Sequence, residues 1–303
     1  MILTLIQMML IIACGAGWRI LSPGGLKAEQ TRLVLTTVVY YVFLPALILD
    51  VLWRAELGIQ SLAFSLLGVS SMLATLMIVW LVTKLLKIGR PQTGAILLVT
   101  AFPNVTYLGL PVLEQAFGSW AKSVAIQMDL FAFSPLLFTV GVLIARYYGE
   151  DSGKHKALLS FLNTPPFWAA FMAVILNINH VAEPLWLVGV LKQLSAAVVP
   201  LMLFSLGLAL NWDAIRIKNI PYIIPVTVIK LLLMPFLAIE IVSYLTLDDQ
   251  NKAAAVLDLA MPSMVLGIVF CDRYKLDSGL YAMAVAVTTL LSMFTLPFWY
   301  SML

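Results

Sequence analysis

Residues 101–104, Ala-Phe-Pro-Asn, interrupt an apolar run that extends from Gln92 to Leu113. A second tetrapeptide, Ala-Met-Pro-Ser at 260–263, interrupts the run at 253–271 at a similar position. Each proline stands roughly ten residues into its run, which is about 15 Å along a helix and near the middle of a bilayer core about 30 Å thick. Proline has no amide donor and frees the carbonyl four residues earlier. We therefore expect two helices that are broken at mid-membrane.

The whole chain has the composition of a membrane protein. Of its 303 residues, 62% are hydrophobic and 11% are charged, whereas a soluble domain carries about a quarter charged residues. The mean hydropathy is +1.01, and a disordered chain would need low hydrophobicity and high charge. These values exclude a soluble enzyme and a disordered protein. The net charge of +3 is small and dispersed, which argues against a nucleic-acid partner.

Apolar runs recur along the whole chain at close spacing. A helical span needs about 20 residues, and most of the runs reach that length. They predict an all-α polytopic membrane protein with ten transmembrane helices, at 2–21, 33–52, 62–86, 92–113, 122–145, 165–179, 185–210, 220–247, 253–271 and 278–303. The first run lacks the basic residues and the small-residue cleavage site of a secretory signal, so we interpret it as a membrane helix.

The positions of the basic residues predict the orientation. Cytoplasmic loops carry an excess of Lys and Arg. Thirteen of the 18 basic residues fall in the odd-numbered loops: Arg19, Lys27, Arg32, Lys84, Lys87, Arg90, Arg146, Lys154, Lys156, Arg216, Lys218, Arg273 and Lys275. We therefore expect these loops in the cytoplasm, both termini on the non-cytoplasmic side, and the chain in the cell inner membrane.

The two halves of the chain resemble each other. Pro45 in the second run corresponds to Pro200 in the seventh, and Pro103 in the fourth corresponds to Pro262 in the ninth. Five helices in each half would make the second copy inverted, and inverted repeats build transporters with a site at mid-membrane. The predicted organisation is a first repeat at 1–146, a cytoplasmic connecting loop at 147–164 and a second repeat at 165–303.

The breaks predict the substrate site. Asn104 and Ser263 directly follow the prolines, and both are good N-cap residues. The half-helices after them would present free amides and a positive dipole end, which favour an anion. The predicted substrate-binding residues are Pro103, Asn104, Val105, Thr106, Pro262, Ser263, Met264 and Lys230. The freed carbonyls of Val99 and Asp258 would suit a cation. Ordinary proline kinks are the alternative interpretation.

Ionisable residues inside the membrane are functional candidates by default. Asp129 and Asp258 are expected to bind a proton or Na⁺ as the coupling ion, with Lys230 as their counter-charge or as an anion partner. A structural ion pair is the alternative for these three. Residues near helix ends are expected to reach the interface instead; these are Asp50, Glu114, Lys192 and Glu240. No metal-ligand spacing and no other cofactor motif is present.

Four stretches of the sequence resemble the auxin efflux carrier family, the bacterial relatives of plant PIN-type carriers. They are VFLPALIL at 42–49, FPNVTYLGLPV at 102–112 with Phe117-Gly118, VPLMLFSLGL at 199–208, and TTLLSMFTLP at 288–297. The resemblance implies inverted repeats whose fourth and ninth helices cross as in sodium–bile acid symporters. It also implies a scaffold of helices 1, 2, 6 and 7, a moving core of helices 3–5 and 8–10, an elevator motion and a homodimer. The resemblance further implies a small organic anion as the substrate, in bacteria a dicarboxylate.

These observations together predict a secondary active or potential-driven transporter of a small organic anion, a carboxylate. Membrane lipids and a second copy of the chain are the other expected partners. Enzyme motifs are absent from the sequence, including a nucleotide-binding loop. The alternatives are a membrane sensor or receptor that uses a transporter fold, and a channel.

Overall fold

The computed structural model describes residues 2–55, 57–150, 164–209 and 219–303. Its described part is all-helical and contains no strand, apart from an isolated antiparallel bridge between Pro103 and Ser263. The predicted connecting loop at 147–164 lies mostly outside the described residues.

The helices are of three kinds. Uninterrupted helices are α1 (Ile2–Leu21), α4 (Ile59–Leu85), α11 (Pro165–Ile178), α12 (Leu185–Ala209) and α17 (Ser278–Met302). Helices that contain π-helical turns are α2–η2–α3 (Ala28–Val38, Val39–Phe43, Leu44–Leu52), α7–η4–α8–η5–α9 (Ala121–Met128, Asp129–Phe133, Ser134–Leu136, Leu137–Gly141, Val142–Tyr148) and α13–η8–α14 (Ile220–Val228, Ile229–Leu233, Met234–Val242). Broken helices are α5 (Arg90–Ala101) followed by η3 (Val105–Gly109) and α6 (Leu110–Phe117), and α15 (Asp249–Leu259) followed by α16 (Ile268–Arg273). A short turn, η1 (Pro23–Gly25), follows α1.

Several of these helices can cross a membrane. Six are long and apolar enough by length and composition: Ala28–Leu52, Ile59–Leu85, Ala121–Tyr148, Leu185–Ala209, Ile220–Val242 and Ser278–Met302. Two shorter apolar helices are Ile6–Leu21 and Pro165–Ile178. A helix bonds its backbone groups internally, as a bilayer requires, because lipid cannot satisfy exposed backbone groups.

Some predicted boundaries are wrong by several residues. The ninth run begins at Asp249 and not at Ala253, because the Asp248 carboxylate caps the helix and accepts the Asn251 amide at 2.9 Å. The eighth run ends at Val242 and not at Leu247. The second run begins five residues earlier than expected, at Ala28.

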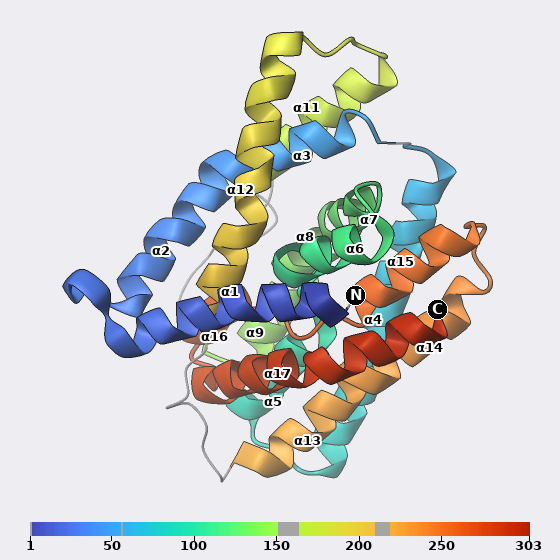
Figure 1. Ribbon diagram of the computed structural model, residues 1–303. Coiled ribbons are helices and arrows are strands. Elements are labelled where there is room, and N and C mark those ends of the chain that lie inside the picture. Colours follow the sequence, from blue (N-terminus) through green and yellow to red (C-terminus); the bar gives the residue numbers. More distant parts are fainter. Residues whose placement is uncertain (1, 56, 151–163, 210–218) are drawn as a thin grey trace.

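The helices pack in two groups (Figure 1). In the first group, α12 packs against α1, α2 and α3, and α11 packs against α3. In the second group, α4, α5, α7, α13, α14, α15 and α17 pack against one another. Contacts between the groups include those of α12 with η3 and of α3 with α7. The broken helices therefore lie in the second group, with η3 facing the first.

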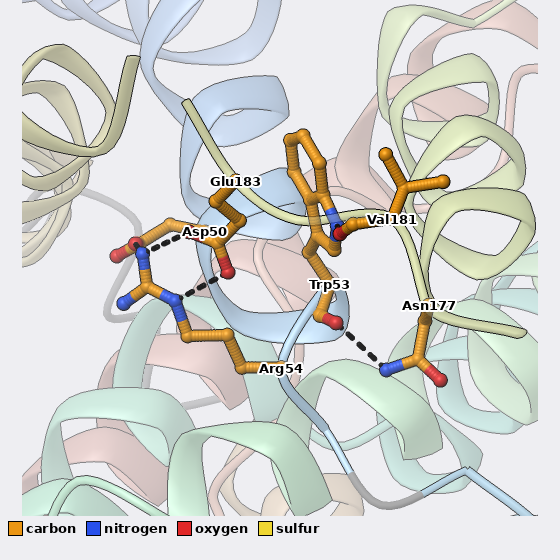
Figure 2. Close-up of polar contacts among 6 residues, drawn as sticks. All are labelled: Asp50, Trp53, Arg54, Asn177, Val181 and Glu183. Atoms are coloured by element: carbon orange, nitrogen blue, oxygen red, sulfur yellow. Dashed lines mark hydrogen bonds and ion pairs between the residues drawn. The ribbon is translucent and has the colours of Figure 1, made fainter. Parts of the chain in front are cut away.

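Polar contacts fix one end of the first group (Figure 2). The Asn177 side-chain amide, on α11, donates to the Leu52, Trp53 and Ala55 carbonyls at 2.8–3.1 Å, which satisfies the C-terminal end of α3. Arg54 donates to both carboxylate oxygens of Glu183, at 2.7 and 2.5 Å. These bonds hold the end of α3 against the segment that joins α11 to α12.

Candidate functional site

The two helix breaks are bonded to each other. The Asn104 amide donates to the Pro262 carbonyl at 2.8 Å, and the Met264 amide donates to the Phe102 carbonyl at 2.9 Å. Both breaks are fully buried, from Phe102 to Asn104 and from Pro262 to Ser263. Because backbone groups without an intrahelical partner are costly in an apolar interior, this pair of bonds lets both helices be broken at one place. The predicted breaks at Pro103 and Pro262 are therefore present and adjacent.

Asn104 stands at the start of η3, as its sequence position suggests. Its carbonyl accepts the Leu108 and Gly109 amides at 3.3 and 2.9 Å. Its side chain makes no capping bond, so the expectation that the side chain caps the helix is wrong. Instead, the side chain is 2% exposed and its Nδ2 has no hydrogen-bond partner within the described structure.

A cavity of 70 Å³ adjoins this side chain. Four of the predicted site residues line it, namely Asn104, Thr106, Asp129 and Met264. The other lining residues are Tyr40, Leu44, Ile48, Tyr107, Leu130, Ser134, Phe138, Thr164, Pro166 and Leu266. The cavity thus lies between the first broken helix, the π turn of Asp129, the middle of the α2–η2–α3 helix and the second break.

Asp129 is held by two hydroxyl groups on this cavity. The Thr106 hydroxyl donates to its Oδ2, and the Ser134 hydroxyl donates to its Oδ1 at 2.9 Å. Thr106 lies on η3, whereas Asp129 begins η4 and Ser134 directly follows it. The two hydrogen bonds therefore connect two helices. Ser134, Tyr40, Tyr107 and Thr164 were not predicted. The sequence signal that could have identified Ser134 is the following residue, Pro135. A π turn precedes that proline, and in it the Ser134 amide donates to the Asp129 carbonyl, which places the two residues one turn apart.

The second break differs from the predicted one. The structure shows no helix starting at Ser263, and α16 begins only at Ile268, after Gly267. The Ser263 amide donates to the Thr288 hydroxyl at 3.3 Å and the Met264 amide is used by Phe102. The prediction that Ser263 caps a second half-helix with free amides is therefore wrong, because these amides already have acceptors. The Ser263 hydroxyl is buried and has no partner among the described residues.

Asp258 is fully buried, and neither of its carboxylate oxygens has a hydrogen-bond partner in the described part of the chain. It lies against the first break, since a Cβ added to Gly109 would be 2.2 Å from Asp258 Oδ1. Its carbonyl accepts the Met261 amide at 3.3 Å, so the prediction that Pro262 leaves this carbonyl free is wrong. No donor to the Val99 carbonyl is found in the described residues.

Lys230 is also fully buried, on the π turn η8. Its Nζ donates to the Met234 sulfur at 3.0 Å. Within the described residues it forms no ion pair with Asp258, whose carboxylate oxygens have no partner there. Lys230 and Asp258 do not line the 70 Å³ cavity.

A larger cavity of 1020 Å³ lies between the two helix groups. Asp50 and Arg54, 3.2 Å apart, line it, as do Glu114 and Lys122, 2.8 Å apart. Lys192 lines it too. Asp50, Glu114 and Lys192 were expected to reach the membrane interface. The structure shows that all three also line this cavity, which the sequence did not predict. Among the described residues, no group of three or more His, Cys, Asp and Glu could hold a metal ion.

Comparison with known proteins gives the family. A family model described as membrane transport protein matches residues 1–300. An uncharacterized transporter of Methanothermobacter thermautotrophicus is 31% identical over 304 residues, which cover 98% of this chain and 96% of the relative. An uncharacterized transporter of Methanocaldococcus jannaschii is 26% identical over 285 residues, which cover 91% of each. The chain therefore belongs to the membrane transport protein family, the auxin efflux carrier family that its sequence resembles, and is a multi-pass membrane protein.

Proposed function

We propose that this chain is a secondary transporter, and not an enzyme, that moves a small carboxylate by alternating access. One observation carries the proposal: Asn104 lines a cavity at the junction of two broken helices, and its buried side-chain amide nitrogen has no partner among the described residues. A buried donor without an acceptor is costly, and a carboxylate oxygen would satisfy it. The backbone amides of Val105 and Thr106 would be further donors for the carboxylate, because the first amides of a helix have no intrahelical acceptor.

We infer ten spans in two inverted repeats. The six long apolar helices, the two shorter ones and the two broken ones account for ten. The bonded breaks at Pro103 and Pro262 support equivalent positions in the two repeats. The first packing group contains the first, second, sixth and seventh spans, which supports a scaffold, and the second group would then be the core that moves as an elevator. A homodimer through the scaffold completes this proposal.

The coupling ion and the orientation are part of the same proposal. A proton or Na⁺ at Asp258 is supported by the two carboxylate oxygens that have no partner in the described residues. Asp129 is the second candidate for the ion. Transport driven by the membrane potential alone remains the uncoupled variant. The distribution of basic residues supports both termini outside the cytoplasm, in the cell inner membrane.

The test is uptake of labelled three- and four-carbon carboxylates into proteoliposomes. We expect saturable uptake by the wild type, a loss of at least tenfold for Asn104→Ala, and altered dependence on pH or Na⁺ for Asp258→Asn. A channel predicts flux that does not saturate, and a sensor predicts binding without turnover. Full activity in both variants would refute this site.

Matched controls separate function from folding. Asn179→Ala removes the same side-chain amide at an exposed helix end, and Asp249→Asn makes the same charge change at a fully exposed position of α15. Both controls should transport like the wild type. Each variant is first checked for an unchanged melting temperature in detergent, so that loss of uptake reports on the site.

A further inference from the structure

The 70 Å³ cavity has two chemically different ends. One part of its lining is Asn104, whose side-chain Nδ2 is itself buried and has no partner among the described residues. Acceptors face it from Asp129 and from the two hydroxyl groups that bind it. The Thr106 and Ser134 hydroxyls both use their proton for Asp129, so they offer only lone pairs to a ligand.

Asp129 retains room for a further donor. An ionised carboxylate has about four acceptor sites, and each Asp129 oxygen accepts one hydroxyl bond. The side chain is partly exposed, in contrast to its fully buried neighbour Met128. A ligand that brings an N–H or O–H to this end would therefore be bound by a charge-assisted hydrogen bond.

The charge of the cavity argues against a second carboxylate at the same end. Among the described residues that line it, Asp129 is the only one with a formal charge, and they include neither Lys nor Arg. Lys230 is bonded to Met234 outside the cavity. Arg32 does not line this cavity either. A dianion would thus place one carboxylate against acceptors and a like charge.

We propose that the transported carboxylate carries a hydrogen-bond donor, an ammonium or a hydroxyl group, on the carbon next to its carboxylate, and that this donor binds Asp129. This inference rests on the proposed function. The small cavity supports it, because 70 Å³ is space for only about five water molecules at roughly 10–15 Å³ each. It assigns Asp129 to the substrate and leaves Asp258 for the coupling ion.

Four ligands with a three-carbon skeleton test the proposal: propionate, lactate, alanine and malonate. They differ in what stands beside the carboxylate, which is nothing, a hydroxyl, an ammonium or a second carboxylate. Binding to the purified full-length wild type is measured by thermal shift, and competition against uptake is measured in proteoliposomes. We expect lactate or alanine to bind on the order of tenfold or more tightly than propionate and malonate, as expected for a charge-assisted bond.

Asp129→Asn tests the partner. If the donor is an ammonium, the preference for alanine over propionate should fall on the order of tenfold, because the charge that binds it is gone. If the donor is a hydroxyl, the preference for lactate over propionate should fall by a smaller factor, because a hydroxyl carries no charge. In either case the affinity for malonate should rise relative to that for propionate, because the like charge of Asp129 is gone. The control Asp249→Asn should keep the wild-type order.

The outcomes distinguish the two proposals. Equal binding of all four ligands, or tighter binding of malonate in the wild type, overturns the inference and leaves the carboxylate transporter intact. An unchanged order in folded Asp129→Asn also overturns it. No binding of any of the four overturns the proposed function as well. The wild-type series stands even if the variant does not fold.

Discussion

Gly109, at the end of η3, and Asp258, near the end of α15, lie against each other beside the first helix break. A Cβ at Gly109 would be 2.2 Å from Asp258 Oδ1 and 3.4 Å from Met261 Cγ. Both residues are buried, and the Gly109 amide is bonded to the Asn104 carbonyl. The absent side chain of Gly109 therefore makes the space in which the Asp258 carboxylate lies.

Gly109→Ala should consequently displace Asp258. We expect a loss of about 1–3 kcal/mol in the free energy of unfolding, as is usual for overpacking a dense interior. The melting temperature in detergent and the ion dependence of uptake should both change. Because Asp258→Ala removes the clashing oxygen, the double variant should be more stable than the sum of the single effects predicts. Additive effects would contradict the contact.

Only part of this residue-scale arrangement could be predicted from the sequence. Pro103 and Asn104 are visible because proline and an N-cap residue have strong local preferences. The hydroxyl bonds from Thr106 and Ser134 to Asp129 are not visible, since they depend on how η3 meets η4. The unused Asn104 amide and the use of the Met264 amide by Phe102 also depend on contacts between distant segments.

At the scale of helical elements, π turns precede four prolines. The turns η2, η3, η4 and η8 each end two residues before Pro45, Pro111, Pro135 and Pro235. In each, the residue before the proline donates to the carbonyl five positions earlier. A wider turn relieves the clash of the proline ring with the preceding turn. Asp129 and Lys230 both lie on such turns, so the prolines set the direction of these side chains.

One proline also explains a contact between helices. Pro235 cannot donate to the carbonyl of Leu231, and the Trp299 indole, on α17, donates to it at 2.8 Å. Trp299→Phe should leave this buried carbonyl without a partner and cost about 1–3 kcal/mol of stability. The measurement is thermal or denaturant unfolding in detergent.

Two comparisons make this test specific. Trp168→Phe changes an exposed Trp and should have little effect. In a Pro235→Ala background the restored amide can reach Leu231, so Trp299→Phe should cost less there. An equal cost in both backgrounds would show that the hydrogen bond is not the cause.

Helices α1 and α12 meet at two glycines. A Cβ at Gly15 would be 2.1 Å from the Phe204 carbonyl, and one at Gly207 would be 2.0 Å from the Ile12 carbonyl. Small residues allow helix backbones to approach closely in membranes. Gly207→Ala should therefore push the two helices apart and cost about 1–3 kcal/mol, read as a lower melting temperature.

Gly17 and Gly189 are the matched controls, since a Cβ at either position meets nothing within 4 Å. Gly17→Ala and Gly189→Ala should be neutral or slightly stabilising, because alanine has the higher helix propensity. A similar loss in all three variants would mean that backbone flexibility, and not close approach, is responsible.

At the scale of the whole molecule, cavities lie at both ends of the interface between the helix groups. The 1020 Å³ cavity is bordered by Arg54, just after α3, and by Lys122, in the first turn of α7. A cavity of 170 Å³ is bordered by Arg19, in the last turn of α1, and by Arg32, on α2. Apolar periodicity cannot predict which helix faces enclose these cavities, because most of the faces are apolar. The charges of the loops predict only the side of the membrane on which each loop lies.

The orientation can be tested by labelling in intact cells with a maleimide that does not cross membranes. In a Cys14→Ser background, Ser119→Cys, which lines the larger cavity, should react from outside. Ala282→Cys, which lines the 170 Å³ cavity, should react only after the membrane is opened. The remaining Cys271 is buried and serves as the unlabelled background. The reverse pattern would contradict the proposed orientation.

The bonds between the two helix breaks also have a consequence for biosynthesis. The amide of Asn104 and the carbonyl of Phe102 receive their partners from residues 262 and 264, which the ribosome makes only after the intervening half of the protein. Until residues 262–264 are made, the Asn104 amide and the Phe102 carbonyl must be hydrated or held by the insertion machinery, since lipid offers these groups no partner. The first half alone should thus insert poorly, and the last helices to be synthesised should complete the assembly of the centre.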